Sequence, residues 1–376
     1  MPNIAINATV LTPKSGGILV YIQNLIDRLL LDPEEFDVYY FFSNHFLKYF
    51  PEYTQSDKVI GLNLSGENPR KRILTDPLKW PGILKKYRID AFHSPISYIP
   101  FGVHVPAVAT IHDLRSFHVR ENYSLLRGAF LRQMIRRTAR KAAKIIAISD
   151  YTRNDLIETL GVPEEKVVRI YEGFDAAPFQ VTYTGQQLRG IREKYNLPEK
   201  YLLSVGHLEP RKNFIRLIQA FNMAIRENKI PHKLVIVGKE NYRYQQFYEI
   251  LAKLNLQKMV QFTGFVAQED LPAIYQQASV FILPTLFEGF GFPPLESMAA
   301  ETPVISSNVT SLPEICGNAA LFFNPYDEKE LVEKIVTLIN DQKLQKNLIN
   351  KGLQNINRFN WERCTMETVK VYREIL

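Results

Sequence analysis

Short apolar runs rich in β-branched residues alternate with longer segments of helical period along the first half of the chain. An apolar run bounded by turn residues predicts a buried strand, and apolar positions that recur every three to four residues predict a helix. The predicted strands are Asn3–Thr9, Asp37–Phe42, Lys58–Leu62, Ala91–His93, Ala107–Ile111, Lys144–Ile148 and Val167–Tyr171. The predicted helices are Leu19–Leu31, Ser124–Lys141 and Tyr151–Leu160.

The same alternation restarts in the second half. The predicted strands there are Tyr201–Val205, Lys233–Val237, Val260–Thr263, Val280–Leu283, Val304–Ser306 and Ala320–Phe323. The predicted helices are Phe214–Arg226, Gln245–Leu254, Glu269–Gln277, Pro293–Ala300 and Glu328–Ile339. Fully apolar strands that alternate with helices are typical of parallel sheets covered on both faces. The pattern therefore predicts an α/β protein of two doubly wound, Rossmann-like units, each with a crevice at the carboxyl ends of its strands.

The polar stretch Phe174–Gln187 has no hydrophobic period and lies between the two patterns, so it is the predicted linker. The predicted domains are residues 1–178 and residues 188–358. Because each unit carries one crevice, we expect a ligand to bind where the two crevices face each other.

Composition narrows the class of protein. Apolar residues make up 46% of the chain and charged residues 23%, which is typical of globular proteins and excludes disorder. No apolar run approaches the roughly 18 residues of a membrane span, and the first residues resemble a strand more than a signal peptide. Two cysteines, Cys316 and Cys364, cannot build a disulfide framework. We expect a soluble, cytoplasmic protein of two domains.

The net charge of +7 is concentrated in residues 120–144, where a single acid, Glu121, accompanies a series of cations. On a helical wheel, one half of this segment is basic, with Arg132, Arg136, Arg137, Arg140, Lys141 and Lys144. The other half carries Leu131, Met134, Ile135, Ala139 and Ala142. A basic helix over 124–144 suits an anionic membrane surface, although the solvated face of an ordinary packed helix shows the same pattern. We expect no nucleic-acid partner.

Several cofactor and metal motifs are missing from the sequence. Its seven histidines show no HExxH spacing and no cysteine pairing, so we expect no metal site. There is no P-loop, no GxSxG elbow, and no GxGxxG after the first strand. We therefore expect no nicotinamide or other bound cofactor.

Two strand ends instead carry groups that suit an anion. Gly16-Gly17 follows the first predicted strand and leads into a helix, where backbone N–H groups can approach a phosphate. Arg211 and Lys212 follow the strand Tyr201–Val205 and precede the next helix, which is where an α/β crevice holds a diphosphate. Gly16-Gly17 could instead form a turn with no ligand, and Arg211 with Lys212 could be a charge pair at the surface.

The segment Leu283–Glu296 is the most informative. An apolar strand leads into a loop with Gly289 and Gly291, and the following helix opens with two prolines. Glu288 precedes the loop, and Glu296 is expected in the first turn of the helix. Carboxylates accept hydrogen bonds from the vicinal hydroxyls of a ribose or a pyranose, whereas complementation of the helix dipole could account for Glu296 alone.

Together these motifs resemble glycosyltransferase family 4. The resemblance rests on Gly206-x-Leu-x-Pro-Arg-Lys-Asn213, on Glu288-x7-Glu296 and the residues that follow it, and on shorter markers upstream. The upstream markers are Gly16-Gly17, Thr110-Ile111-His112-Asp113-Leu114, Ser149-Asp150-Tyr151-Thr152-Arg153 and Tyr171-Glu172-Gly173-Phe174-Asp175. Family members are retaining enzymes of the two-Rossmann GT-B fold, which implies that residues 359–376 cross back onto the N-terminal domain.

The resemblance also implies roles for individual residues. Arg211 and Lys212 would bind the donor diphosphate, Glu296 the ribose, and Glu288 the transferred sugar, while His112 would lie near the anomeric carbon. Gly16 or Gly17 would close on the diphosphate from the other domain. The remaining donor-binding residues would be Phe265 and Val266, which border the base, and Gly289, Phe290, Gly291, Phe292 and Leu295 in the loop and helix.

The implied reaction is metal-independent transfer of a hexosyl unit with retention, from a nucleotide-diphosphate sugar to a hydroxyl of a glycan or lipid-linked acceptor. The loop resembles mannosyl-type members, which suggests GDP-mannose and a part in polysaccharide biosynthesis at the inner face of the membrane. The alternative hypothesis for the donor is a UDP-sugar, from which glucose or N-acetylglucosamine would be transferred. A non-catalytic binder of nucleotide sugars or polyanions, an epimerase and a phosphorylase are alternatives of other classes.

Overall fold

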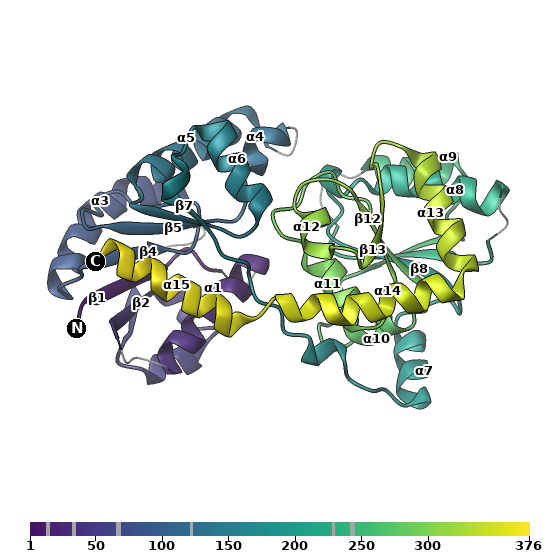
Figure 1. Cartoon of the computed structure of the whole chain (residues 1–376), viewed down its shortest axis with the longest axis horizontal. Helices are drawn as coiled ribbons and strands as arrows, with labels where there is room; N and C mark the ends of the chain where they lie inside the picture. The colour runs from purple at the N-terminus through teal and green to yellow at the C-terminus, as the bar shows by residue number, and fades with distance from the viewer. Residues whose placement is uncertain (13–15, 32–34, 65–68, 121–122, 228–229, 241–244) are drawn as a thin grey trace. The chain divides into compact units, whose positions relative to one another are not determined.

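The computed structural model describes the chain except residues 13–15, 32–34, 65–68, 121–122, 228–229 and 241–244. The described residues form two compact units, which we call the N-terminal unit and the C-terminal unit. The N-terminal unit comprises Met1–Phe117, Leu125–Gly173 and Phe359–Leu376, and the C-terminal unit comprises His118–Ser124 and Phe174–Arg358. Each unit has a sheet flanked by helices (Figure 1).

A parallel sheet forms the centre of the N-terminal unit, with the strand order β3-β2-β1-β4-β5-β6-β7. Its strands are β1 (Asn3–Ala8), β2 (Asp37–Ser43), β3 (Val59–Leu62), β4 (Ala91–Ser94), β5 (Ala107–Ile111), β6 (Lys144–Ala147) and β7 (Val167–Arg169). The chain runs outward from β1 to β3 and returns to β4 on the other side of β1. Such a reversal is the switch point at which doubly wound sheets hold ligands.

Helices cover both faces of this sheet. Their bounds are α1 (Gly17–Leu31), α3 (Pro69–Lys86), α5 (Leu125–Lys141), α6 (Asp150–Leu160) and α15 (Trp361–Ile375). Helices α3, α5 and α6 share an apolar cluster with alternate strand residues such as Ala109. Successive strand residues point to opposite faces, so Thr110 faces the other layer, where it lies 3.0 Å from the Tyr21 hydroxyl of α1. His93 contacts Tyr372 of α15 in the same layer, and α1 and α15 pack together (Figure 1).

The C-terminal unit repeats this plan with the order β10-β9-β8-β11-β12-β13. Its strands are β8 (Tyr201–Val205), β9 (Lys233–Val237), β10 (Val260–Gly264), β11 (Val280–Leu283), β12 (Val304–Ser307) and β13 (Ala320–Phe323). Its helices include α7 (Gly185–Lys194), α8 (Phe214–Glu227), α9 (Gln245–Lys253), α10 (Leu271–Gln276), α11 (Phe292–Ala299), α12 (Leu312–Cys316), α13 (Glu328–Asn340) and α14 (Gln342–Asn355). Its core is built from α8, α9, α13 and the strand residues beneath them.

The predicted strands and the two-unit α/β architecture are confirmed, and the stretch Phe174–Gln187, which was predicted as a linker, belongs by its contacts to the C-terminal unit. The chain divides at residue 173, and Phe174–Gln187 includes the 3-10 helix Ala177–Phe179 and the start of α7. Gln276 donates hydrogen bonds to the carbonyl oxygens of Phe179 and Val181. This stretch is therefore polar because it lies at the surface, yet it packs on the C-terminal unit.

The basic helix is shorter than predicted, and only some of the cations on its basic half are free of contacts with carbonyl or carboxylate groups of the described chain. Helix α5 ends at Lys141, and Lys144 is the first residue of β6 and pairs with Glu374. Arg132 and Arg137 each donate to a backbone carbonyl oxygen, at 3.1 Å and 2.6 Å. The remaining cations of that half are exposed: Arg136, Arg140 and Lys141. The predicted apolar half is buried or half-buried, as expected.

Among the described residues, no helix combines the length and apolar character needed to cross a membrane.

Candidate active site

His112 follows directly after β5, a strand whose five residues are all buried. Its Nδ1 lies 3.0 Å from Glu172 Oε1, and its Nε2 lies 3.0 Å from the carbonyl oxygen of Pro95. Both partners only accept hydrogen bonds, whereas a neutral imidazole offers one donor and one acceptor. With Glu172 ionised, both ring nitrogens act as donors, which favours the imidazolium form of His112.

The electrostatics of this pair agree with its geometry. Burial would lower the pKa of His112, but the hydrogen bond and the charge of Glu172, with smaller contributions from Pro95 and Asp113, raise it overall. Glu172 is only 2% exposed, so its charge is poorly screened. His93 shows the contrast, because burial lowers its pKa to about 3 and its partners are the hydroxyl groups of Tyr372 and Thr110.

The glycine turn lies at the start of α1. Gly16 has φ +58°, in the left-handed region that glycine adopts without strain, and its carbonyl oxygen accepts from Leu19 N at 2.9 Å. Gly17 is the first residue of the helix, whose first turn contains no acid. Residues 13–15, which precede the turn in the predicted motif, lie outside the described residues. A helix start of this kind is suited to an anion.

Arg211 and Lys212 lie where the sequence predicts them, after β8, on the short 3-10 helix Pro210–Lys212. Asn213 ends this turn in the left-handed conformation, φ +58°. Its side-chain amide donates to the carbonyl oxygens of Pro284 and Pro325, at 3.1 Å and 2.9 Å. Asn213 thereby fixes the two cations relative to the loop that follows β11.

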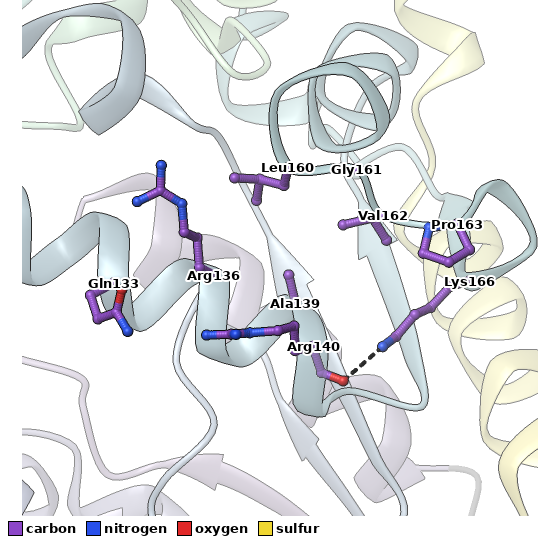
Figure 2. Close-up of a pocket in the computed structure, with 9 residues that line it drawn as sticks. All are labelled: Gln133, Arg136, Ala139, Arg140, Leu160, Gly161, Val162, Pro163 and Lys166. Atoms are coloured by element: carbon purple, nitrogen blue, oxygen red, sulfur yellow. Dashed lines mark hydrogen bonds between the residues drawn. The ribbon is translucent and has the colours of Figure 1, made fainter.

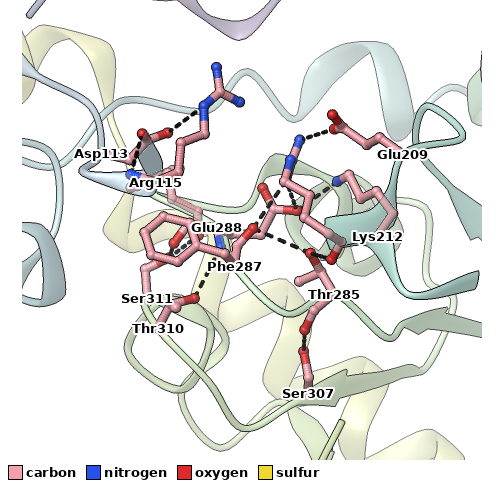
Figure 3. Close-up of polar contacts among 12 residues, drawn as sticks. Asp113, Arg115, Glu209, Lys212, Thr285, Phe287, Glu288, Ser307, Thr310 and Ser311 are labelled. Atoms are coloured by element: carbon pink, nitrogen blue, oxygen red, sulfur yellow. Dashed lines mark hydrogen bonds and ion pairs between the residues drawn. The ribbon is translucent and has the colours of Figure 1, made fainter. Parts of the chain in front are cut away.

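Arg211 and Lys212 meet Glu288 in one ion cluster, of which Figure 3 labels Glu209, Lys212 and Glu288. Glu288 Oε1 lies 2.8 Å from Arg211 Nη1 and 2.6 Å from Lys212 Nζ, and Arg211 Nη2 lies 2.6 Å from Glu209 Oε1. All four side chains are largely buried. The structure therefore brings together three residues that the sequence predicted and adds Glu209, which it did not.

Burial and charge oppose each other in this cluster. Burial would raise the pKa of Glu288, but Arg211 and Lys212 outweigh it and lower the pKa to about 2. Burial lowers the pKa of the Lys212 ammonium; Glu288 raises it and Arg211 lowers it, with a net decrease. Two cations and two carboxylates sum to a neutral cluster, in which Glu288 is firmly ionised.

Polar side chains around Glu288 hold the loop after β11. The hydroxyl of Thr285 donates to the Arg211 carbonyl oxygen at 3.0 Å, and Ser311 donates to the carbonyl oxygens of Glu288 and Phe290. Thr310 accepts from the Glu288 amide at 3.1 Å (Figure 3). No motif in the sequence marks these residues, because hydroxyls distant in sequence carry no recognisable spacing.

The expected place of Glu296 is wrong. Helix α11 begins at Phe292, with Gly291 (φ +116°) as its N-cap, and its first turn contains no acid. Glu296 lies in the second turn, so complementation of the helix dipole does not account for it. The Tyr275 hydroxyl donates to Glu296 Oε2 at 2.7 Å, while burial raises the pKa of Glu296. Tyr275 is a supporting residue that no sequence motif indicates.

The other predicted donor residues differ in what they can offer a ligand. Phe265 is 68% exposed, and Lys239 Nζ lies over one face of its ring, 5.0 Å from the ring centre. Val266, Phe290 and Leu295 have buried side chains and can offer only backbone groups. Gly289 and Gly291 are also buried, and Phe292 is half-buried.

These features define a class of protein. Two Rossmann-like units, each a doubly wound parallel sheet with polar and ionic groups at its strand ends, form the architecture of GT-B glycosyltransferases. The chain belongs to the glycosyltransferases: the Glycosyltransferase Family 4 model matches residues 15–177, and the Glycosyl transferases group 1 model matches residues 189–355.

Curated relatives carry related names. The chain is 28% identical over 301 residues to O-antigen chain mannosyltransferase B of Escherichia coli, which covers 80% of this chain and 78% of that protein. It is also 28% identical over 238 residues to the serotype-specific mannosyltransferase WbdA of Escherichia coli, covering 63% of this chain. That match spans only 29% of WbdA, so the matched segment corresponds to less than a third of that protein.

Solved structures share the fold over the whole chain. Sucrose-phosphate synthase from Thermosynechococcus elongatus aligns with a TM-score of 0.76 at 21% identity, covering 100% of this chain and 99% of that one. HepE of Anabaena, solved in complex with UDP-glucose, aligns with a TM-score of 0.76 at 17% identity, covering 100% of both chains. At these identities the likeness shows the GT-B fold alone.

Proposed function

We propose that this glycosyltransferase transfers a mannosyl unit, with retention and without a metal ion, from a nucleotide-diphosphate sugar to a hydroxyl of a glycan or lipid-linked acceptor. The observation that carries the proposal is the cluster of Arg211, Lys212 and Glu288 at the carboxyl end of β8. It combines two phosphate-binding cations with an ionised carboxylate for sugar hydroxyls. The names of the mannosyltransferase relatives support the choice of sugar.

The proposed chemistry follows from the charges of this cluster. When the nucleoside diphosphate departs, negative charge grows on its β-phosphate, and N–H donors fixed in a buried site stabilise that charge strongly. Arg211 and Lys212 supply such donors, so they perform the work that a divalent cation does in other enzymes. Glu288, with its pKa near 2, stays ionised and accepts hydrogen bonds from the sugar.

His112 is proposed to act as a fixed positive charge and not as a base. Both its ring nitrogens donate, to Glu172 and to Pro95, so it has no lone pair with which to take a proton. The proton of the acceptor hydroxyl would then pass to the leaving-group oxygen on the same face of the sugar. This transfer is consistent with retention.

An assay of several nucleotide sugars as donors distinguishes the candidate substrates. We expect the purified chain to consume GDP-mannose faster than UDP-glucose, UDP-N-acetylglucosamine or GDP-fucose, with release of GDP. UDP-sugar consumption would favour the alternative donor, which the exposed Phe265 ring could stack equally well. Product analysis by NMR distinguishes the remaining classes: an epimerase releases no glycoside, and a non-catalytic binder consumes no donor.

We also propose that the N-terminal unit faces the acceptor's membrane, on its cytoplasmic side, through helix α5. Its first residues, Leu125 and Leu126, are 90% and 84% exposed, and Arg136, Arg140 and Lys141 are exposed further along. Each cation near an anionic leaflet contributes about 1 kcal/mol. Sedimentation with phosphatidylglycerol vesicles at rising salt tests this surface; equal sedimentation with neutral vesicles would refute it.

A further inference from the structure

A hollow opens in the N-terminal unit between the ends of α5 and α6 (Figure 2). It measures about 620 Å³. The lining includes small and apolar residues, Ala139, Gly161 and Val162, and is completed by Gln133, Arg136, Arg140, Leu160, Pro163 and Lys166. Three of these side chains are cations and none is an acid, so the lining carries a charge of +3.

The three cations differ from their neighbours on the same surface. Arg132 and Arg137 donate to backbone carbonyl oxygens, and Lys144 pairs with Glu374. In contrast, neither Arg136 nor Arg140 pairs with a carboxylate of the described chain; the Arg136 guanidinium lies 5.0 Å from the centre of the Phe117 ring. Stacking holds that guanidinium in place while its N–H groups stay available.

Lys166 is the third cation, on the opposite wall of the hollow. Its Nζ donates to the Arg140 carbonyl oxygen at 3.0 Å, which draws it toward α5 (Figure 2). Burial lowers its pKa, and no nearby carboxylate of the described chain offsets that effect. A bound anion would supply the charged partner that this ammonium lacks in the described chain.

Helix dipoles do not account for these charges. Both α5 and α6 end beside the hollow, and each helix C-terminus is equivalent to about −0.5 of an elementary charge. Against a lining of +3, the two termini leave a surplus of about +2. A surplus of that size matches the charge of a phosphate group near neutral pH.

The hollow is separate from the site at His112. Arg140 and Lys166 precede β6 and β7, so they lie near the amino ends of these strands, whereas His112 follows the carboxyl end of β5. In a parallel sheet these are opposite edges. We therefore propose that the hollow binds a phosphate group, held by Arg136, Arg140 and Lys166, as free phosphate or as the headgroup of an anionic lipid.

Calorimetric titration of the full chain with inorganic phosphate, at constant ionic strength set by chloride, tests the site. We expect saturable binding that weakens about tenfold or more in Arg140→Gln and in Lys166→Gln, because each loses a charge-assisted hydrogen bond. Arg127→Gln is the matched control, since Arg127 is an exposed cation of the same helix outside the hollow. Non-saturable binding, or an equal loss in the control, would overturn the proposal.

A vesicle experiment identifies the source of the phosphate. Phosphatidylglycerol vesicles are sedimented with the wild type, Arg140→Gln and Arg127→Gln, with and without inorganic phosphate. Selective loss in Arg140→Gln and competition by phosphate assign the site to a lipid headgroup; equal sedimentation of both variants, beside saturable phosphate binding, assigns it to a free phosphate. The phosphate arm does not depend on the proposed transfer reaction, and only the vesicle arm depends on the proposed membrane surface.

Discussion

Replacement of Glu288 by glutamine tests whether the ion cluster stabilises the C-terminal unit. The substitution keeps the shape of the side chain but removes the charge that pairs with Arg211 and Lys212, at 2.8 Å and 2.6 Å. Two neighbouring cations then remain buried with one carboxylate, Glu209. Breaking a buried pair by removing one partner is costly because it leaves an uncompensated charge.

The size of the effect follows from the pKa of Glu288. Folding lowers this pKa from its ordinary value of 4.5 to about 2. At about 1.36 kcal/mol per pH unit, the ionised carboxylate contributes about 3 kcal/mol to the free energy of unfolding. Because the folded-state pKa is the lower one, this contribution is complete above pH 4.5 and is lost as the pH falls toward 2.

We expect Glu288→Gln to lower the free energy of unfolding by about 3 kcal/mol at pH 7, with the difference from the wild type shrinking below pH 4.5. Both tryptophans, Trp80 and Trp361, belong to the N-terminal unit, so their fluorescence is an internal control. Urea unfolding followed by circular dichroism, measured from pH 7 down to about pH 2, reports the change and its pH dependence. Hydrogen exchange of peptides from the C-terminal unit at pH 7 assigns the change to that unit. Glu269→Gln makes the same replacement at an exposed position of the same unit and is the control. A deficit that does not depend on pH would refute the reasoning.

Three further outcomes are expected. Lys212→Ala should reduce turnover about 10²–10³-fold while circular dichroism shows an intact fold, because it removes a donor to the leaving-group charge; near-normal turnover would exclude Lys212 from the site. Donor consumption should survive EDTA, and loss that manganese restores would contradict a metal-independent reaction. Glu172→Gln should lower the pKa of His112, measured by NMR titration, since Glu172 raises it; the stability gained from the imidazolium is present at low pH and is lost as the pH rises through that pKa.

The strands could be predicted from the sequence because each contains a short run of apolar residues between turn or helical segments. Helix α3 could not, since Pro77 and Pro81 lie inside it and proline removes a backbone donor and disfavours the helix interior. What stabilises α3 is tertiary contact: Trp80 and Leu84 are buried in the apolar cluster of the N-terminal unit. Packing of this kind overrides local propensity and leaves no periodic signal in the chain.

The candidate site was partly predictable, because local sequence shows which residues follow each strand but not which of them pair in the folded chain. Strand ends place Arg211, Lys212 and Glu288 at one edge of a sheet, so their proximity follows from the fold. Their pairing does not, because Glu288 is 76 residues from Lys212 in the chain. Likewise, Glu172 belongs to a motif that the sequence displays, but its contact with His112, 60 residues away, depends on tertiary structure.

The neutral sum of the ion cluster has a consequence for ligand binding. Arg211 already divides its N–H groups between Glu209, Glu288 and the Phe287 carbonyl oxygen, and Lys212 donates to Glu288. A diphosphate must compete with Glu288 for the same donors, so an internal carboxylate weakens anion binding at this site. Glu288→Gln is therefore expected to bind GDP or UDP more tightly than the wild type in calorimetry, even as it destabilises the unit and slows turnover. Weaker nucleotide binding by this variant would show that the cations do not face the diphosphate.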